Sequence, residues 1–490
     1  MPHFPRALSL APALLTMSLV LSACSGGTPA APVTEASPAP VAETPPAPPA
    51  ITPPTPAPGP ARLTVSADGH RLEYTDGRPF LYWGDTAWEL FHRPNREDAR
   101  TYLQTRARQG FTVVQAAALA EESGLTVPNA QGDLPLVGKD PTRPAVTPGN
   151  DPGDPEQYDY WDHVDYIVDQ AASLGLTVAL LPSWGIWVNN EPRLGDEPIF
   201  TPDSARSYGR FLGERYRDKP ILWVLGGDRY PNTEEVRAIW RAMAQGIEQG
   251  VGGGDRALIT YHTRGAKSSS QYFHDEPWLD FNMWHTGHCR GEQEATKLLA
   301  DYKRTPAKPV INAEPMYEGH PVCHHVPNGY GDEVDVRNIA YWSVFAGAAG
   351  HAYGHRKVYG FDVYDGDKAW QKALDTAAVR QLGYFRTLLE SRPMKDRGPD
   401  DTLVAGSFVG DRPVVAMRGP DYAWLYLPDG GPVTVRLGRT GGARVRASWF
   451  DPRTGTRAEI GTFANAGERT FTASSAGRGN DWVLLLEATP

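Results

Sequence analysis

The 490-residue sequence predicts an α/β fold, a (β/α)8 TIM barrel followed by a small all-β sandwich domain. Between about residues 80 and 358, short apolar runs alternate with helical patterns, as they do in βα units around a parallel sheet. The runs number eight, which is the count that this barrel requires. From residue 399 onward, short alternating runs separated by Gly, Pro and Asp are typical of one small antiparallel sandwich.

The N-terminal segment has the pattern of an export signal. The apolar stretch after Arg6 is too short to span a bilayer comfortably, and it ends in Leu21-Ser22-Ala23-Cys24. This tetrapeptide resembles a bacterial lipobox, in which the signal is cut before the cysteine and the thiol is lipidated. We therefore expect a signal peptide at 1–23 and lipidation at Cys24. An ordinary signal peptide with an incidental cysteine is the alternative, and it also predicts export.

Residues 24–61 are predicted to form a tether. Residues 28–60 contain 13 prolines among Ala, Thr and Glu, a composition that forms no core and favours extended polyproline II structure. A lipidated cysteine followed by such a spacer predicts a protein anchored to the cell envelope, in the periplasm or at the cell surface. The membrane is then one partner of the chain.

Composition restricts the other partners. The net charge is -10 at pH 7, which argues against binding to nucleic acid. The 14 tryptophans and 21 tyrosines exceed the usual aromatic content, and such rings can stack on the apolar faces of sugars or pack in a core.

The predicted strands of the barrel follow one another along the chain. They are residues 80–88, 112–119, 177–185, 221–228, 257–263, 281–287, 309–315 and 350–355.

Helix-capping residues support the segments between these strands. Thr201-Pro202-Asp203 supplies an N-cap, a proline at the first helical position and an early acid, and Asn232-Thr233-Glu234-Glu235 opens another helix. Gly110 and Gly175 each end a helix just before a strand. The predicted domains are a catalytic barrel at 62–397 and a β-sandwich accessory domain at 398–490.

Polar and aromatic side chains gather at the predicted strand ends. In a (β/α)8 barrel these ends converge on one mouth, where active sites lie. The candidate substrate-binding residues are Asp85, Trp88, Gln115, Glu121, Trp184, Arg229, His262, His285, Tyr353 and His355.

Two carboxyl groups at this mouth suit the hydrolysis of a glycosidic bond. That reaction needs one protonated carboxyl for the leaving group and one ionised carboxyl that attacks or activates water. Asp228 ends the fourth strand and Glu314 the seventh, so the two face each other across the mouth. By analogy with the large retaining (β/α)8 glycosidases, Asp228 is the acid/base and Glu314 the nucleophile. The alternative for Asp228 is a structural acid bonded to backbone amides or to Arg229.

The two remaining cysteines, Cys289 and Cys323, are predicted to form a disulfide, as a cysteine pair in an exported protein commonly does. A zinc site with His285 and His288 is the alternative. The chain lacks CxxC and HExxH spacing there, so we predict no metal and no cofactor.

Several motifs resemble the apiosidase-like glycoside hydrolases, family 140. They include GDTAWELFHR, WVLGGDR, FHDEPWLDFNMWHTGH and AYWSVFAGAAGHAYGH. The resemblance extends from about residue 62 to 490 and includes the C-terminal module, which in this group is labelled a collagen-binding-type domain. It implies a barrel that releases oligosaccharide side chains of plant pectin attached through β-linked apiose. The family's catalytic residues fall on Asp228 in LGGDR and on Glu314 in NAEP, while the Cys289 and Cys323 pair is a departure.

The sequence therefore predicts a retaining glycoside hydrolase with an oligosaccharide or polysaccharide as its substrate. The alternative is a non-catalytic surface lipoprotein that binds polysaccharide or collagen. A metal-dependent hydrolase is a third hypothesis.

Overall fold

The computed structural model describes residues 62–361, 369–405 and 411–489. The predicted signal peptide, the predicted lipidation site Cys24 and the predicted tether lie outside the described residues. Within the described part, no helix has the length and apolarity needed to cross a membrane.

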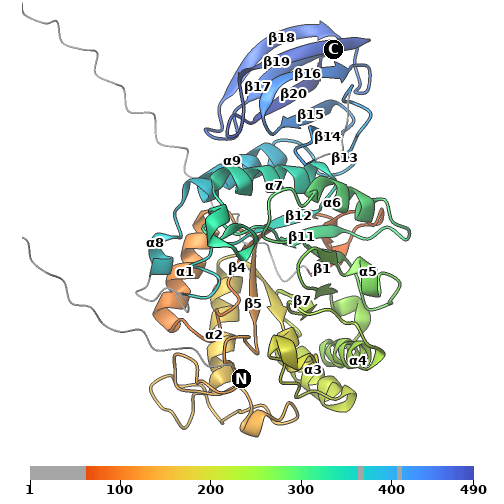
Figure 1. The fold of residues 1–490 in the computed structure, drawn as a ribbon. Coiled ribbons are helices and arrows are strands. Elements are labelled where there is room, and N and C mark those ends of the chain that lie inside the picture. The colour runs from red at the N-terminus through yellow and green to blue at the C-terminus, as the bar shows by residue number, and fades with distance from the viewer. Residues whose placement is uncertain (1–61, 362–368, 406–410, 490) are drawn as a thin grey trace, which may run out of the picture. The chain divides into compact units, whose positions relative to one another are not determined.

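Eight parallel strands form the barrel, and their hydrogen-bonded order is β8-β7-β6-β5-β4-β12-β11-β10 (Figure 1). All eight predicted strands are present, so the predicted fold class is confirmed. Their bounds are β4 (Tyr82–Thr86), β5 (Val113–Ala117), β6 (Thr177–Leu181), β7 (Ile221–Gly226), β8 (Ile259–His262), β10 (Asn282–His285), β11 (Val310–Glu314) and β12 (Gly350–Tyr353).

The barrel is nearly closed, because β8 and β10 meet without a regular ladder. At this seam the Ile259 N–H donates to the Asp280 carboxylate at 2.7 Å, and the Asp280 N–H donates to the Ile259 carbonyl at 2.8 Å. The Thr260 hydroxyl donates to the Phe281 carbonyl at 2.6 Å. The short strand β9 (Lys267–Ser268) pairs antiparallel with the end of β10.

Helices separate the strands along the chain, as βα units require. Their bounds are α1 (Arg96–Arg108), α2 (Tyr160–Ser173), α3 (Pro202–Tyr216), α4 (Glu234–Val251), α5 (Ser270–Phe273), α6 (Glu294–Tyr302), α7 (Glu333–Phe345), α8 (Ala369–Lys372) and α9 (Ala377–Glu390). The predicted caps on α3 and α4 are present, since Thr201 and Thr233 accept hydrogen bonds from the Ser204 and Val236 amides.

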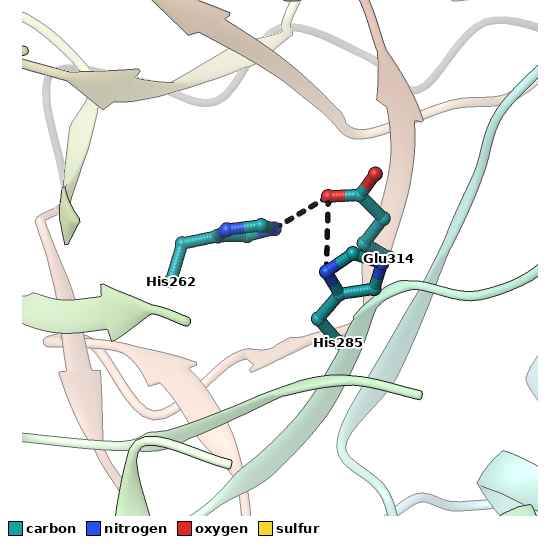
Figure 2. Close-up of side chains that lie close together, drawn as sticks. All are labelled: His262, His285 and Glu314. Carbon is teal, nitrogen blue, oxygen red and sulfur yellow. Dashed lines mark ion pairs between the residues drawn. The ribbon is translucent and has the colours of Figure 1, made fainter. Parts of the chain in front are cut away.

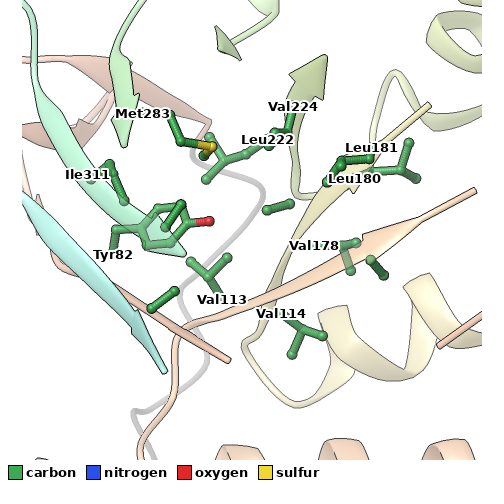
Figure 3. Close-up of a cluster of buried hydrophobic side chains, with 14 of the residues drawn as sticks. Tyr82, Val113, Val114, Val178, Leu180, Leu181, Leu222, Val224, Met283 and Ile311 are labelled. Carbon is green, nitrogen blue, oxygen red and sulfur yellow. The ribbon is translucent and has the colours of Figure 1, made fainter. Parts of the chain in front are cut away.

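The barrel is filled by apolar side chains from its own strands, some of which are drawn in Figure 3. Val113, Leu222 and Ile311 are fully buried there. A short antiparallel sheet precedes the barrel and comprises β1 (Leu63–Val65), β2 (Leu72–Tyr74) and β3 (Pro79–Phe80).

The C-terminal domain consists of two antiparallel sheets. One has the order β13-β14-β15-β20-β17-β18, and the other pairs β16 with β19. The bounds are β13 (Gly398–Pro399), β14 (Val415–Arg418), β15 (Tyr422–Leu427), β16 (Gly430–Arg436), β17 (Arg444–Phe450), β18 (Arg457–Ala464), β19 (Glu468–Ala476) and β20 (Trp482–Thr489).

Strand β15 is buried on both faces, which explains its unbroken apolar sequence YAWLYL. Leu425 joins the core between the two sheets, whereas Trp424 and Tyr426 belong to the core of the barrel domain. The Tyr426 ring stacks on Tyr341 of α7 with centroids 4.3 Å apart.

Candidate active site

The C-terminal ends of four neighbouring strands supply the central side chains of the site. His262 ends β8, His285 ends β10 and Glu314 ends β11, while Asp228 lies two residues beyond β7. In Figure 2, the His262 and His285 rings both approach the Glu314 carboxylate.

Glu314 is contacted through both carboxylate oxygens. His262 Nε2 lies 2.8 Å from Oε2, and His285 Nδ1 lies 3.7 Å from the same oxygen. On the other side, the Tyr317 hydroxyl donates to Oε1 at 2.7 Å and His288 Nε2 lies 3.4 Å from it. Four side chains therefore fix the position of this carboxylate.

Asp228 reaches the mouth through an unusual backbone turn. Gly226, Gly227 and Asp228 all have positive φ, at 90°, 127° and 49°. A Cβ on Gly226 would lie 2.1 Å from the His262 carbonyl oxygen, and one on Gly227 would lie 2.8 Å from the Trp184 ring. The glycines are therefore needed for close approach to neighbouring strands and loops.

His285 links the two carboxylates. Its Nδ1 is 3.2 Å from Asp228 Oδ1 and 3.7 Å from Glu314 Oε2. The two oxygens can therefore be no farther apart than the sum of these distances, about 7 Å. The Asp228 side chain is 35% exposed and that of Glu314 only 6%, so Asp228 is the more accessible from solvent.

The histidines determine the charge of both acids. Burial disfavours ionisation of Glu314, but His285, His262 and His288 outweigh it and hold the pKa of Glu314 well below its usual value. Burial would also raise the pKa of Asp228, but the hydrogen bond and charge of His285 lower it. Burial opposes the charged form of His285, yet Glu314 and Asp228 raise its pKa to about 9. The free site thus holds two carboxylates and the His285 imidazolium near neutral pH.

A third carboxyl group, Glu121, lies in the loop after β5. Burial and the charge of Asp228 raise its pKa to about 8. Arg229 Nη1 is 3.7 Å from Glu121, but the Arg229 Nε donates to Asp196 at 2.7 Å. Arg229 therefore pairs mainly with Asp196, and the charge of Asp228 is balanced by His285 instead.

Aromatic rings form one wall of the site. The centroid of the Trp88 ring lies 5.1 Å from that of Trp184 and 5.3 Å from that of His262. The Trp88 Nε1 donates to the Tyr317 hydroxyl at 3.0 Å. The buried Trp184 Nε1 has no hydrogen-bond partner among the described residues.

Three candidate binding residues point away from the mouth. Asp85 is fully buried and accepts hydrogen bonds from Tyr102 and Arg106 of α1, at 2.6 and 2.7 Å. Tyr353 pairs in register with Asp85 and donates to Glu318 at 2.5 Å.

Gln115 is the third of these residues, and it lies inside the barrel. It donates to Thr86 and to the Ala313 carbonyl, at 3.0 and 2.9 Å. His355 lies in the loop after β12, where its Nδ1 accepts a hydrogen bond from the Lys357 amide.

Two residues of the site were not among the candidates from strand ends. His288 and Tyr317 follow His285 and Glu314 by three positions and turn back to contact Glu314. This spacing is the only signal in the sequence that could have indicated them. Cys289, next to His288, forms a disulfide with Cys323.

The same side chains were considered as a metal site. In the described part of the chain, His262, His285 and Glu314 are the group whose ligand atoms all lie within 4.8 Å of one another. Two ligands about 2.1 Å from a tetrahedral zinc ion are roughly 3.4 Å apart. His262 and Glu314, at 2.8 Å, are closer and form a direct ion pair instead. This arrangement fits acid–base chemistry better than metal binding.

Two family models match successive parts of the chain. Residues 66–396 match the family model described as "Apiosidase-like, catalytic domain", and residues 399–487 match "Putative collagen-binding domain of a collagenase". A search of curated proteins gave no significant match.

Two solved structures are similar over most of the chain. One, titled "Glycoside hydrolase", is 32% identical with a TM-score of 0.76, covering 88% of this chain and 97% of that one. A glycoside hydrolase of family 5 from Bacteroides vulgatus ATCC 8482 is 33% identical, also with a TM-score of 0.76, covering 87% of this chain and 93% of that one. The chain therefore belongs to the apiosidase-like family of glycoside hydrolases.

Proposed function

We propose that the protein is a retaining glycoside hydrolase in which Asp228 is the acid/base and Glu314 the nucleophile. The observation that carries the proposal is that His285 Nδ1 contacts both carboxylates at once, which keeps the two acids close together. Retaining enzymes have their two carboxyl groups about 5 to 5.5 Å apart, whereas inverting enzymes need about 6.5 to 9.5 Å. The limit of about 7 Å on this pair of oxygens is compatible with the separation that retention needs.

The contacts of Glu314 suit a nucleophile. It is ionised and largely shielded from water, and its carboxylate is held by an ion pair with His262 on one oxygen and by a hydrogen bond from Tyr317 on the other. Such a group can attack an anomeric carbon with little reorganisation.

The proton for the leaving group comes from the Asp228–His285 pair. Asp228 is ionised in the free site, so it must gain a proton before it can act as the acid. His285 holds one at neutral pH, and its Nδ1 is 3.2 Å from Asp228. When a sugar displaces water from Asp228, the carboxylate loses solvation and the proton moves onto it.

The second half of the reaction reverses this transfer. Once Glu314 is esterified, it no longer carries the charge that helped raise the pKa of His285. Asp228 then acts as the base toward water and takes up its proton, as the double-displacement mechanism requires.

We further propose that the substrate is a plant pectic side chain with an apiose linkage. The support is the apiosidase-like family model that matches residues 66–396.

Variants of the two acids test the catalytic assignment. Asp228→Asn and Glu314→Gln should each lower turnover of a pectic apioside by about 1,000-fold or more, equivalent to about 4 kcal/mol of barrier. Asp203→Asn and Glu214→Gln, on the outer surface of α3, are matched controls that should retain full activity. Wild-type rates in both Asp228→Asn and Glu314→Gln would refute the assignment of these two residues as catalytic.

Product stereochemistry tests the mechanism. The anomer first formed from a panel of pectic side-chain oligosaccharides can be followed by NMR. Retention is expected, and inversion would overturn the double-displacement proposal while leaving the two acids in place. Full activity after exhaustive chelation would exclude the metal-dependent alternative.

The second candidate function is polysaccharide or collagen binding without catalysis, which the family match at residues 399–487 favours. It predicts that the full chain binds such a polymer without releasing product. Product release that depends on Asp228 would argue against it.

We also propose that the protein is exported and lipid-anchored through Cys24. The support is the lipobox-like sequence before a proline-rich segment. Cys24→Ser should move the protein from the membrane fraction to the soluble fraction, and an unchanged distribution would refute the anchor.

A further inference from the structure

The loops after β10 and β11 meet beside Glu314. His288 lies in the first loop, is 7% exposed, and places Nε2 3.4 Å from Glu314 Oε1. The second loop carries Tyr317, whose hydroxyl donates to the same oxygen at 2.7 Å. One side of the carboxylate is therefore held by a residue from each loop.

A disulfide joins these two loops at the residue next to His288. Cys289 is bonded to Cys323, and the Cys323 N–H donates to the His288 carbonyl at 2.8 Å. The covalent bond at Cys289 and the hydrogen bond to the His288 carbonyl both restrain the backbone on the C-terminal side of His288.

The second loop also packs against the His288 ring. His320 stacks on it with centroids 4.7 Å apart, and the His324 ring lies edge-on at 5.3 Å. Cys323 and His324 both have left-handed backbone conformations, with φ of 56° and 58°. Non-glycine residues rarely adopt this conformation, so the surrounding contacts must maintain it.

We propose that His288 is a positioning residue for Glu314 and that the Cys289–Cys323 disulfide holds it in place. Full activity then requires the disulfide. This inference rests on the proposed function, since it assumes that Glu314 is the nucleophile.

The contacts of the two Glu314 oxygens show how His288 contributes to the position of the carboxylate. Oε2 is held by His262 and His285, and Oε1 by Tyr317 and His288. Loss of the His288 contact leaves Oε1 with one partner, so the carboxylate can rotate about its last bond. Misplacement of a reacting group by about 1 Å can cost up to about 100-fold in rate.

Reduction of the disulfide should have the same effect. A dithiol such as dithiothreitol would break the sulfur–sulfur bond, form two cysteine thiols and be oxidised itself to a cyclic disulfide. Its two electrons and two protons balance the step. The loop that carries His288 would then be free to move away from Glu314.

The experiment compares Cys289→Ser/Cys323→Ser with the parent chain, both carrying Cys24→Ser so that no other cysteine remains. The double variant should lose about 10- to 100-fold in kcat. Dithiothreitol should lower kcat of the parent but have no effect on the double variant, which is the matched control.

The pH profile distinguishes positioning from a general loss of structure. The groups that face Glu314 are Asp228 from the β7 loop, His262 from β8, His285 from β10, and His288 and Tyr317 from the two loops. His288 is one of the groups that lower the pKa of Glu314. Removing its contact should therefore move the acidic limb of kcat/KM to higher pH in the double variant.

Substitution of His288 keeps the inference testable if the double variant does not fold. His288→Ala should lower kcat and shift the acidic limb, whereas His288→Gln, with a nitrogen at a similar position, should restore much of both. Wild-type kcat and an unshifted limb in the double variant, or in His288→Ala, would overturn the inference. If the parent chain has no glycosidase activity, the proposed function fails instead.

Discussion

The pKa of His285 gives the sharpest prediction about the site. The imidazole lies between two carboxylates, at 3.2 and 3.7 Å, and its pKa is raised from 6.5 to about 9. This shift corresponds to about 3 kcal/mol of preference for the charged form. The imidazolium should therefore persist across neutral pH, and kcat/KM should fall as the pH rises through about 9.

His285→Asn removes the charge while leaving an amide nitrogen near the position of Nδ1. In this variant the alkaline limb near pH 9 should disappear. The acidic limb should move to higher pH, because the His285 charge no longer lowers the pKa of Glu314. Initial rates between pH 4 and pH 10 with one pectic substrate, alongside melting temperatures at each pH, would measure both limbs.

Glu121 is the control for this experiment, because its pKa of about 8 could produce an alkaline limb of its own. Glu121→Gln should leave the limb near pH 9 in place. An unchanged limb in His285→Asn, or an NMR titration of His285 near pH 6.5, would refute the reasoning.

The stability of the folded protein should also depend on pH through His285. Because folding raises the pKa of His285, its contribution to stability is complete below about pH 6.5 and is lost as the pH rises through about 9. The parent chain should thus lose more thermal stability than His285→Asn over this interval.

Three other variants test the fold that supports the site. Asp481→Ala should destabilise the protein by about 3 to 5 kcal/mol, because it leaves the buried Arg337 guanidinium without the carboxylate that it contacts at 2.6 Å. An unchanged melting temperature would contradict this prediction. Gly227→Ala should lower kcat/KM by about tenfold or more, because its Cβ would lie 2.8 Å from the Trp184 ring, and normal kinetics would show that the loop can adjust. Asp85→Asn should lower the melting temperature without changing KM, because Asp85 pairs with Tyr102 and Arg106 of α1. A large rise in KM would instead show that Asp85 takes part in substrate binding.

The sequence predicted the architecture well because hydrophobic alternation and capping residues are local signals. The apolar runs located all eight strands of the barrel, and Thr201 and Thr233 marked two helix starts. The seam between β8 and β10 could not be predicted, because it depends on hydrogen bonds of Asp280 that reach another part of the chain.

The structure places some strand-end candidates around Glu314 and others elsewhere, for one physical reason. Successive side chains of a strand face opposite sides, so a strand end does not by itself point to the mouth. Thr86 faces into the barrel, where it contacts Gln115, and Asp85 therefore faces the helices. Tyr353, in register with Asp85, faces the same way. The alternation of side chains along β4 and β12 would therefore have excluded both Asp85 and Tyr353 as substrate-binding candidates.

The two acids also differ in how the chain presents them, and this difference suits their proposed roles. Glu314 is the last residue of β11 and still lies within the ladder with β10, where it pairs with His285 after a shift in register. Asp228 follows two glycines with positive φ, outside the ladder, and its side chain is six times more exposed than that of Glu314. A nucleophile must hold one position while it forms a bond, whereas an acid/base must serve first a leaving group and then water. Gly226 and Gly227 therefore place the more exposed acid near the more buried one, and His285 contacts both and can carry the proton.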